Sequence, residues 1–129
     1  MIYRKVVIIS LLYAFVGVMP AKACNLPDEI VRALENGEAK SVGKYFNSSV
    51  ELILPSNQGV YGKAQAEQIL KNFFEGNSPG NFKYKHLQTI NKENTQFYIG
   101  QLYTGKGIYR IYVYIKDRFI HQMRVESND

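Results

Sequence analysis

The spacing of hydrophobic residues changes from a helical to an extended pattern near residue 80 of the chain. Before this point, apolar side chains recur every three or four positions in three segments, which predicts three short amphipathic helices. After it, apolar and polar residues alternate one by one, which predicts strands with one buried face. The pattern therefore predicts an α+β domain in which helices precede most of the strands.

The three predicted helices differ in length and in how they end. The first opens at residues 25–29, where two acids favour the positive end of the helix dipole, and Gly37 ends it. The second is short and covers residues 39–46. The third begins near Lys63, has the clearest helical periodicity of the chain, and is expected to be capped by Gly76.

Two short strands and four longer strands are predicted. Residues 50–54 form the first strand, after a turn at residues 47–49, and residues 60–61 give at most a brief second strand. A loop is expected at residues 77–81, and residues 127–129 are expected to be a frayed end. Short turns connect the four longer strands and predict an antiparallel meander. These strands occupy residues 82–90, 97–103, 108–115 and 119–125.

The first 23 residues have the layout of a secretory signal peptide, with a positive start, an apolar run and a small-residue end. The apolar run, residues 6–19, is shorter than the roughly 20 residues that a membrane-spanning helix needs. We therefore expect an exported protein, periplasmic or extracellular, with no membrane span. One mature domain remains, residues 24–129.

The end of the signal peptide leaves two ways of processing open. Small residues at Ala21 and Ala23 predict ordinary cleavage between Ala23 and Cys24. A cysteine in this position can instead be lipidated, as in bacterial lipoproteins, which would hold the domain at a membrane surface. Cys24 is the only cysteine, so we expect no internal disulfide and no cysteine-based metal site.

The net charge of +5 falls when the signal peptide is left out. Three of the 16 basic residues lie in residues 1–23, so the mature domain has 13 basic residues against 11 acidic ones. A balance this close to neutral is ordinary for a soluble domain and is not the footprint of a nucleic-acid-binding protein. We expect no nucleic-acid partner.

Residue types that carry catalysis or bind metals are scarce in the mature chain. The three mature aspartates fall at a helix start, a turn and the terminus. His86 and His121 are the only histidines, and their spacing is not that of a metal site. Glu51 lies in a predicted strand and could point inward, although glutamate is seldom fully buried. No phosphate-binding glycine loop is present, so the sequence predicts no metal, no cofactor and no catalytic set.

A set of polar residues on two neighbouring predicted strands is the most suggestive candidate site, because alternate residues of a strand share one face. If this face lines the interior, two guanidinium groups and two phenols converge and suit a polar or anionic small ligand. If it faces outward, it is a polar sheet surface. The candidate ligand-binding residues are Arg110, Tyr112, Tyr114, Gln122 and Arg124. The alternate set expected to form the core is Tyr109, Ile111, Val113 and Ile115.

Three stretches of the chain carry a family resemblance. They are residues 26–30 (LPDEI), residues 59–70 (GVYGKAQAEQIL) and residues 120–126 (IHQMRVE). They resemble an exported bacterial family of unknown function, a DUF-type family, within the nuclear transport factor 2-like superfamily, and the resemblance covers nearly all of residues 25–126. It implies a cone in which three N-terminal helices pack on a curved, mainly antiparallel sheet that ends in a four-stranded meander.

The resemblance and the residues together leave two functions open. The first is a non-catalytic exported module that binds a small polar or anionic ligand or a protein. Since cone domains often pair through the exposed sheet face, a homodimer is a natural variant, and the tyrosine-rich strands would then be interface. The second is a small enzyme, a hydrolase, isomerase or dehydratase, with Glu51, a histidine or a tyrosine inside the cone.

Overall fold

The computed structural model describes residues 26–90 and 94–128, and it describes side chains for all of these except residues 84–90. The predicted signal peptide, with Ala23 and Cys24 at its end, lies outside the described residues.

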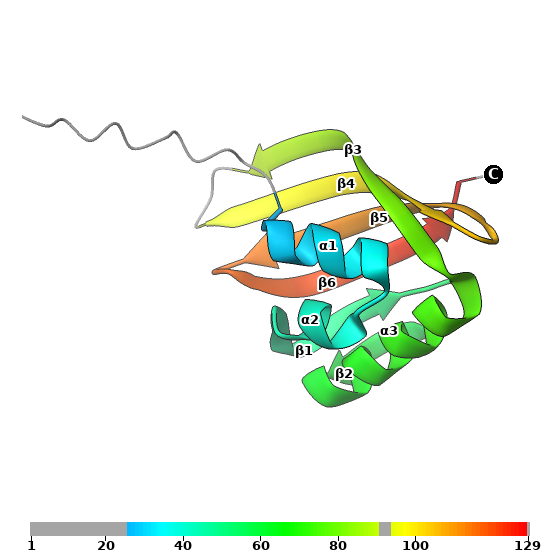
Figure 1. Ribbon diagram of the computed structural model, residues 1–129. Helices are drawn as coiled ribbons and strands as arrows, with labels where there is room; N and C mark the ends of the chain where they lie inside the picture. The colour runs from blue at the N-terminus through cyan, green and yellow to red at the C-terminus, as the bar shows by residue number, and fades with distance from the viewer. Residues whose placement is uncertain (1–25, 91–93, 129) are drawn as a thin grey trace, which may run out of the picture.

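Two helices, a strand hairpin, a third helix and four further strands follow one another along the chain (Figure 1). The helices are α1 (Asp28–Asn36), α2 (Ala39–Gly43) and α3 (Lys63–Asn77). The strands are β1 (Phe46–Ile53), β2 (Gln58–Gly62), β3 (Pro79–Ile90), β4 (Thr95–Thr104), β5 (Gly107–Lys116) and β6 (Phe119–Ser127).

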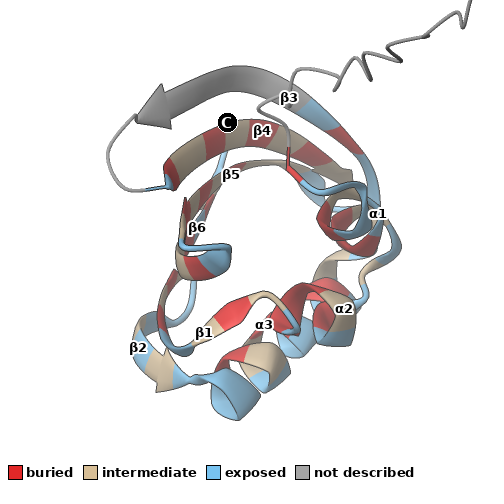
Figure 2. Cartoon of the chain, turned by 90° about the vertical axis from the view of Figure 1, so that its left-hand side faces the viewer, coloured by how far each residue is buried: buried red, intermediate tan, exposed pale blue. Residues whose placement is uncertain are grey.

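All six strands join one sheet in the order β2-β1-β6-β5-β4-β3. Every neighbouring pair is antiparallel except β1 and β6, which run parallel. The sheet curves around the helices, which lie on its concave side (Figures 1 and 2). The predicted α+β class is therefore confirmed, with a mostly antiparallel sheet.

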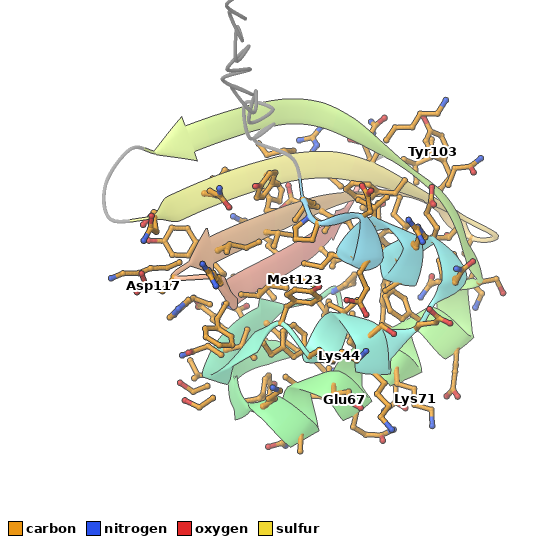
Figure 3. The ribbon with its side chains drawn as sticks, turned by 60° about the vertical axis from the view of Figure 1, so that its left-hand side comes forward. Lys44, Glu67, Lys71, Tyr103, Asp117 and Met123 are labelled. Atoms are coloured by element: carbon orange, nitrogen blue, oxygen red, sulfur yellow. The ribbon has the colours of Figure 1, made fainter. Side chains whose placement is uncertain are left out.

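Side chains from the concave face of the sheet and from the helices form one hydrophobic core. Met123 of β6, for example, is fully buried and lies between the sheet and the helices (Figure 3). Ile111, Val113 and Ile115 are buried, as predicted, whereas Tyr109 is half-buried at the margin of the core. This packing stabilises α1 and α2, which are too short to persist alone.

The turn predicted at residues 47–49 is wrong, because these residues belong to β1. The helix α2 ends at Gly43, and Phe46 is buried opposite Ile120 of β6. Asparagine and serine favour turns in isolation. Burial and pairing with a distant strand can override this preference, because strand propensity depends on context. A distant strand cannot be read from a local pattern.

The predicted end of the third helix is also wrong. Gly76 lies inside α3, and Ser78 is the residue in the left-handed conformation, with φ 47°, whose N–H donates to the Phe74 oxygen at 3.0 Å. The strand β3 then begins at Pro79, so the loop predicted for residues 77–81 is wrong as well. By contrast, Gly37 ends α1 in the left-handed conformation, as predicted.

The C-terminal end is more ordered than predicted. The strand β6 continues through Ser127, and the Asn128 N–H donates to the Ile108 oxygen at 2.9 Å. The expected frayed end is therefore wrong for these two residues, because they pair with the start of β5. Asp129 lies outside the described residues.

Candidate functional site

The convex face of the sheet, turned away from the helices, carries the polar and aromatic side chains that the strands do not bury. We call this surface the outer face. It consists of Glu51 and Ile53 of β1, Gln122, Arg124 and Glu126 of β6, Arg110, Tyr112 and Tyr114 of β5, and Phe97, Ile99, Gln101 and Tyr103 of β4.

The five candidate ligand-binding residues all lie on the outer face, on the adjacent strands β5 and β6. Tyr112 pairs with Arg124, and Tyr114 pairs with Gln122, so the structure brings the set together. The set does not line the interior of the cone, because the alternate residues of β5 are buried there and only one face of a strand can point inward. Of the two arrangements expected from the sequence, the structure has the polar sheet surface.

Tyr112 is the centre of a hydrogen-bonded network on this surface. Its hydroxyl donates to Glu126 Oε1 at 3.1 Å and accepts from Arg110 Nη1 at 3.4 Å. Arg124 Nε pairs with the other carboxylate oxygen of Glu126 at 3.2 Å, and its guanidinium lies 5.7 Å from the centre of the Tyr112 ring. Arg110 Nη2 also donates to Asn128 Oδ1 at 2.7 Å. Both arginines are therefore held against the sheet.

The same contacts favour the charged form of Arg110. The hydrogen bond to Tyr112 raises the pKa of Arg110 above its ordinary value, and the nearby Glu126 carboxylate acts in the same direction. The outer face thus presents a permanent cation whose position is set by a tyrosine and an asparagine.

Glu51, the carboxylate that the enzyme hypothesis would place inside the cone, lies on the outer face. Its Oε1 accepts a hydrogen bond from Gln122 Nε2 at 2.9 Å, across the parallel pair of β1 and β6. The side chain is half-buried by this contact and does not reach the core.

His121 lies at a β-bulge in β6. The register between β5 and β6 shifts between Tyr114 and Ile115, so that Gln122 and Ile120 pair with neighbouring residues and His121 is the extra one. The predicted alternation that placed His121 on one face with Met123 is therefore wrong, and the His121 ring instead meets the ring of Tyr114, with centres 6.5 Å apart. One signal in the sequence marks the bulge: Ile120 and Met123, both buried, are three positions apart instead of two.

The described tyrosines of the C-terminal strands differ in where they lie. Tyr98 is only 2% exposed and donates to Gln96 Oε1 at 3.0 Å, so it belongs to the core. Tyr103, Tyr112 and Tyr114 stand half-exposed on the outer face. Lys83 of β3 lies over the ring of Tyr103, with its Nζ 5.5 Å from the ring centre, and extends the aromatic and cationic surface across the sheet.

Two open hollows lie away from the five candidate residues. One, of about 320 Å³, is at the turn between β5 and β6 and is lined by Asn94, Gln96, Asp117 and Arg118. The other, of about 500 Å³, lies between α2 and the first half of α3, where Figure 3 labels Glu67 and Lys71. None of the five candidate residues lines either hollow, so neither hollow gives them a pocket for a small ligand.

Neither a metal cluster nor a membrane-spanning helix is found in the described part of the chain. No group of three or more His, Cys, Asp or Glu residues is arranged to hold a metal ion among residues 26–83 and 94–128, whose side chains are described. No helix within the same residues is long and apolar enough to cross a membrane. His86 pairs through its backbone with Ile99, and its side chain is not among those described.

Several solved structures of other proteins have a fold similar to that of this chain. A protein from Bacteroides uniformis, described as a DUF4783 family protein, is 27% identical, covers 81% of this chain and 99% of its own, and superposes with a TM-score of 0.74. A protein of the same description from Bacteroides ovatus is 23% identical, with 83% and 99% covered and a TM-score of 0.74. The protein described as "Rd1NTF2_04 with long sheet" is 14% identical, with 76% and 94% covered and a TM-score of 0.63.

The third of these structures, at 14% identity, shows a shared fold alone. No curated protein matches the chain. The family model that matches, over residues 27–126, is described as "Domain of unknown function (DUF4783)". With nearly all of its described residues matched, the chain belongs to the DUF4783 family.

Proposed function

We propose that this domain is an exported, non-catalytic module that binds a partner protein on the outer face of its sheet. The single observation that carries the proposal is the network around Tyr112, which holds two arginines and a glutamate in fixed positions on an open, aromatic surface. Tyrosine, phenylalanine and arginine are enriched at protein interfaces, where rigid side chains lose little entropy on binding.

The shape of the outer face favours a protein over a small molecule. Small-molecule sites are usually concave and cover most of the ligand surface. The five predicted residues lie on a convex sheet, and their cations already bond to Glu126 and Asn128. A broad protein surface can contact such groups without displacing these bonds, whereas a small anion would compete with the Glu126 carboxylate for Arg124.

The alternative of a small enzyme has less support from the described residues. The hypothesis needs an acid, a histidine or a tyrosine in an enclosed pocket. Glu51 and His121 contact other groups on the outer side of the sheet, and Tyr98 is packed into the core. Loss of a measured turnover in Glu51→Gln or His121→Ala protein would favour the enzyme instead.

The proposal is tested by the size of the protein's native assembly. We expect the wild-type protein in a gently solubilised envelope fraction to elute as a complex larger than one chain. Tyr114→Glu, which places a charge on the outer face, should shift it to a smaller size. Gln65→Glu adds the same charge on the exposed side of α3 and should leave the elution unchanged.

Light scattering of the same complex identifies the kind of partner. A mass of twice the chain that Tyr114→Glu reduces to one chain would mean that the partner is a second copy bound through the outer face, the variant that the family resemblance left open. A larger or different mass means another protein. The proposal fails if Tyr114→Glu and Gln65→Glu elute like the wild type.

A further inference from the structure

The strand β2 forms one edge of the sheet. It is the first strand in the sheet order and pairs, within the described residues, only with β1 (Figure 2). An edge strand presents backbone N–H and C=O groups that can pair with another strand. We therefore asked which groups of β2 point outward and whether anything blocks them.

The hairpin between β1 and β2 sets the direction of these groups. Leu54 and Asn57 exchange two hydrogen bonds, from the Leu54 N–H at 2.7 Å and from the Asn57 N–H at 3.3 Å. In an antiparallel ladder, bonded and non-bonded pairs alternate from such a point. The register continues without a shift, so Gln58 and Val60 direct their N–H and C=O groups away from β1. Gly62 directs its N–H the same way, whereas its C=O, at the N-cap of α3, accepts the first bond of the helix.

The sequence of β2 lacks the features that protect sheet edges. Its five residues, QGVYG, include no charge and no proline, which are the common devices against edge pairing. Val60 is 68% exposed, more than any other large hydrophobic residue in the described part of the chain. The opposite edge is different, because the Glu35 carboxylate of α1 accepts the Phe82 N–H of β3 at 2.9 Å.

We propose that β2 pairs antiparallel with the β2 of a second copy of this chain, about a two-fold axis through Val60. This register places Val60 opposite Val60 and Gln58 opposite Gly62 of the other copy. The two Val60 residues then exchange two hydrogen bonds, and each Gly62 N–H donates to the Gln58 C=O opposite. The spacing of these residues about Val60 is thus self-complementary, as a two-fold contact requires.

The absence of charge in β2 suits this occupant, because no like charges meet across the axis. The two Val60 side chains would cover each other on the outer side of the joined sheet. The contact is short, and a stable interface usually buries about 800 Å² on each partner. The dimer is therefore weak and concentration-dependent, and it joins two outer faces into one wider surface.

Disulfide trapping tests both the contact and its register. Residues of a bonded antiparallel pair have Cα atoms about 5.5 Å apart, within the range that a disulfide spans. Val60→Cys should therefore form covalent dimers under mild oxidation. Gln58→Cys alone should not, because its two copies would lie several residues apart across the axis. The wild-type chain, with Cys24 as its only cysteine, gives the background.

A mixed experiment fixes the register independently. Gln58→Cys protein mixed with Gly62→Cys protein should form the heterodimer, because these residues face each other. A side chain at Gly62 has open space, with no atom within 4 Å of its Cβ position. The proposal is overturned if Val60→Cys and Gln58→Cys give equal amounts of dimer, or if neither exceeds the wild-type background.

Sedimentation of Val60→Lys protein is the second measurement. The side chain is exposed, so the fold should persist, while two lysines facing each other should weaken the dimer roughly tenfold. The test of the β2 contact is independent of the test of partner binding on the outer face. Tyr114→Glu should leave the Val60→Cys crosslink intact, and Val60→Lys should leave partner binding by each outer face intact.

Discussion

Single residues decide how tightly the curved sheet closes on its core, and Gly100 of β4 is the clearest case. It pairs with Tyr84 of β3 and is buried on the concave face. A methyl group at this position would overlap the ring of Phe82. Glycine here allows one aromatic ring to lie directly over the backbone of the neighbouring strand, a usual reason for glycine within a strand.

We expect Gly100→Ala to lower the free energy of unfolding by roughly 1–3 kcal/mol or more, as overpacking does in other cores. Gly76→Ala is the matched control. It lies inside α3 with no atom within 4 Å of a new Cβ, so it should raise the free energy of unfolding by about 0.5–1 kcal/mol. Urea unfolding of both variants checks the prediction. Equal effects would mean that the Phe82 ring moves aside freely.

A second residue-scale contact joins α1 to the start of β1. The Tyr45 hydroxyl donates to Glu29 Oε1 at 2.7 Å, and Lys44 Nζ lies 3.1 Å from Oε2. The hydrogen bond from Tyr45, followed by the contact with Lys44, lowers the pKa of Glu29. The ionised carboxylate therefore contributes stability above the ordinary glutamate pKa of about 4.3, and this is lost as pH falls through the lowered value.

Tyr45→Phe should raise the pKa of Glu29 toward its ordinary value, because the strongest contact with the ionised form is removed. An NMR titration that follows the Glu29 carboxyl group measures it directly. Lys44→Met is the comparison variant and should also raise the pKa of Glu29, because it removes the other contact that lowers it. A Glu29 titration unaltered by Tyr45→Phe would show that the hydroxyl does not bond to this carboxylate in solution.

At the scale of elements, local periodicity predicted the parts of the chain whose burial is regular. The third helix and most of the C-terminal sheet repeat their apolar positions regularly, and these elements were located to within a few residues. The first half of β1 was missed because Phe46 pairs with Ile120, more than 70 positions away. The bulge at His121 was missed because strict alternation was assumed throughout the strand.

The C-terminal end of α3 is attached to β5 by a small side-chain cluster. Asn77 Oδ1 accepts from the Tyr109 hydroxyl at 2.8 Å, and Asn77 Nδ2 donates to the Phe73 oxygen at 2.8 Å. The rings of Phe73 and Tyr109 meet edge to face, with centres 5.1 Å apart. This cluster fixes the end of the helix against the sheet, since an asparagine side chain can bond to both elements.

Asn77→Ala should lower the free energy of unfolding by roughly 1–3 kcal/mol, because two hydrogen bonds are lost. Tyr109→Phe keeps the ring contact and removes one bond, so its loss should be smaller. Amide exchange at the end of α3 would report the same change locally. If Asn77→Ala is as stable as the wild type, the helix end is held by packing alone.

At the scale of the whole molecule, the sequence indicated which side of the sheet would be buried but not what the other side does. Ile111, Val113 and Ile115 identified the inner face by their hydrophobicity. The polar set on β5 and β6 was found as a group, but its place outside the cone depends on the curvature of six strands, which no local pattern contains. The network around Tyr112 likewise depends on Glu126 and Asn128, which sequence reasoning did not select.

The measurement that tests the central claim most directly is photo-crosslinking from the outer face. A photoreactive phenylalanine analogue placed at Tyr114, in cells that make the protein, should form an adduct with a partner protein. The same analogue at Gln65, on the exposed side of α3, should form none. Adducts from Gln65 and not from Tyr114 would contradict the account, because binding would then occur on the helical side of the molecule.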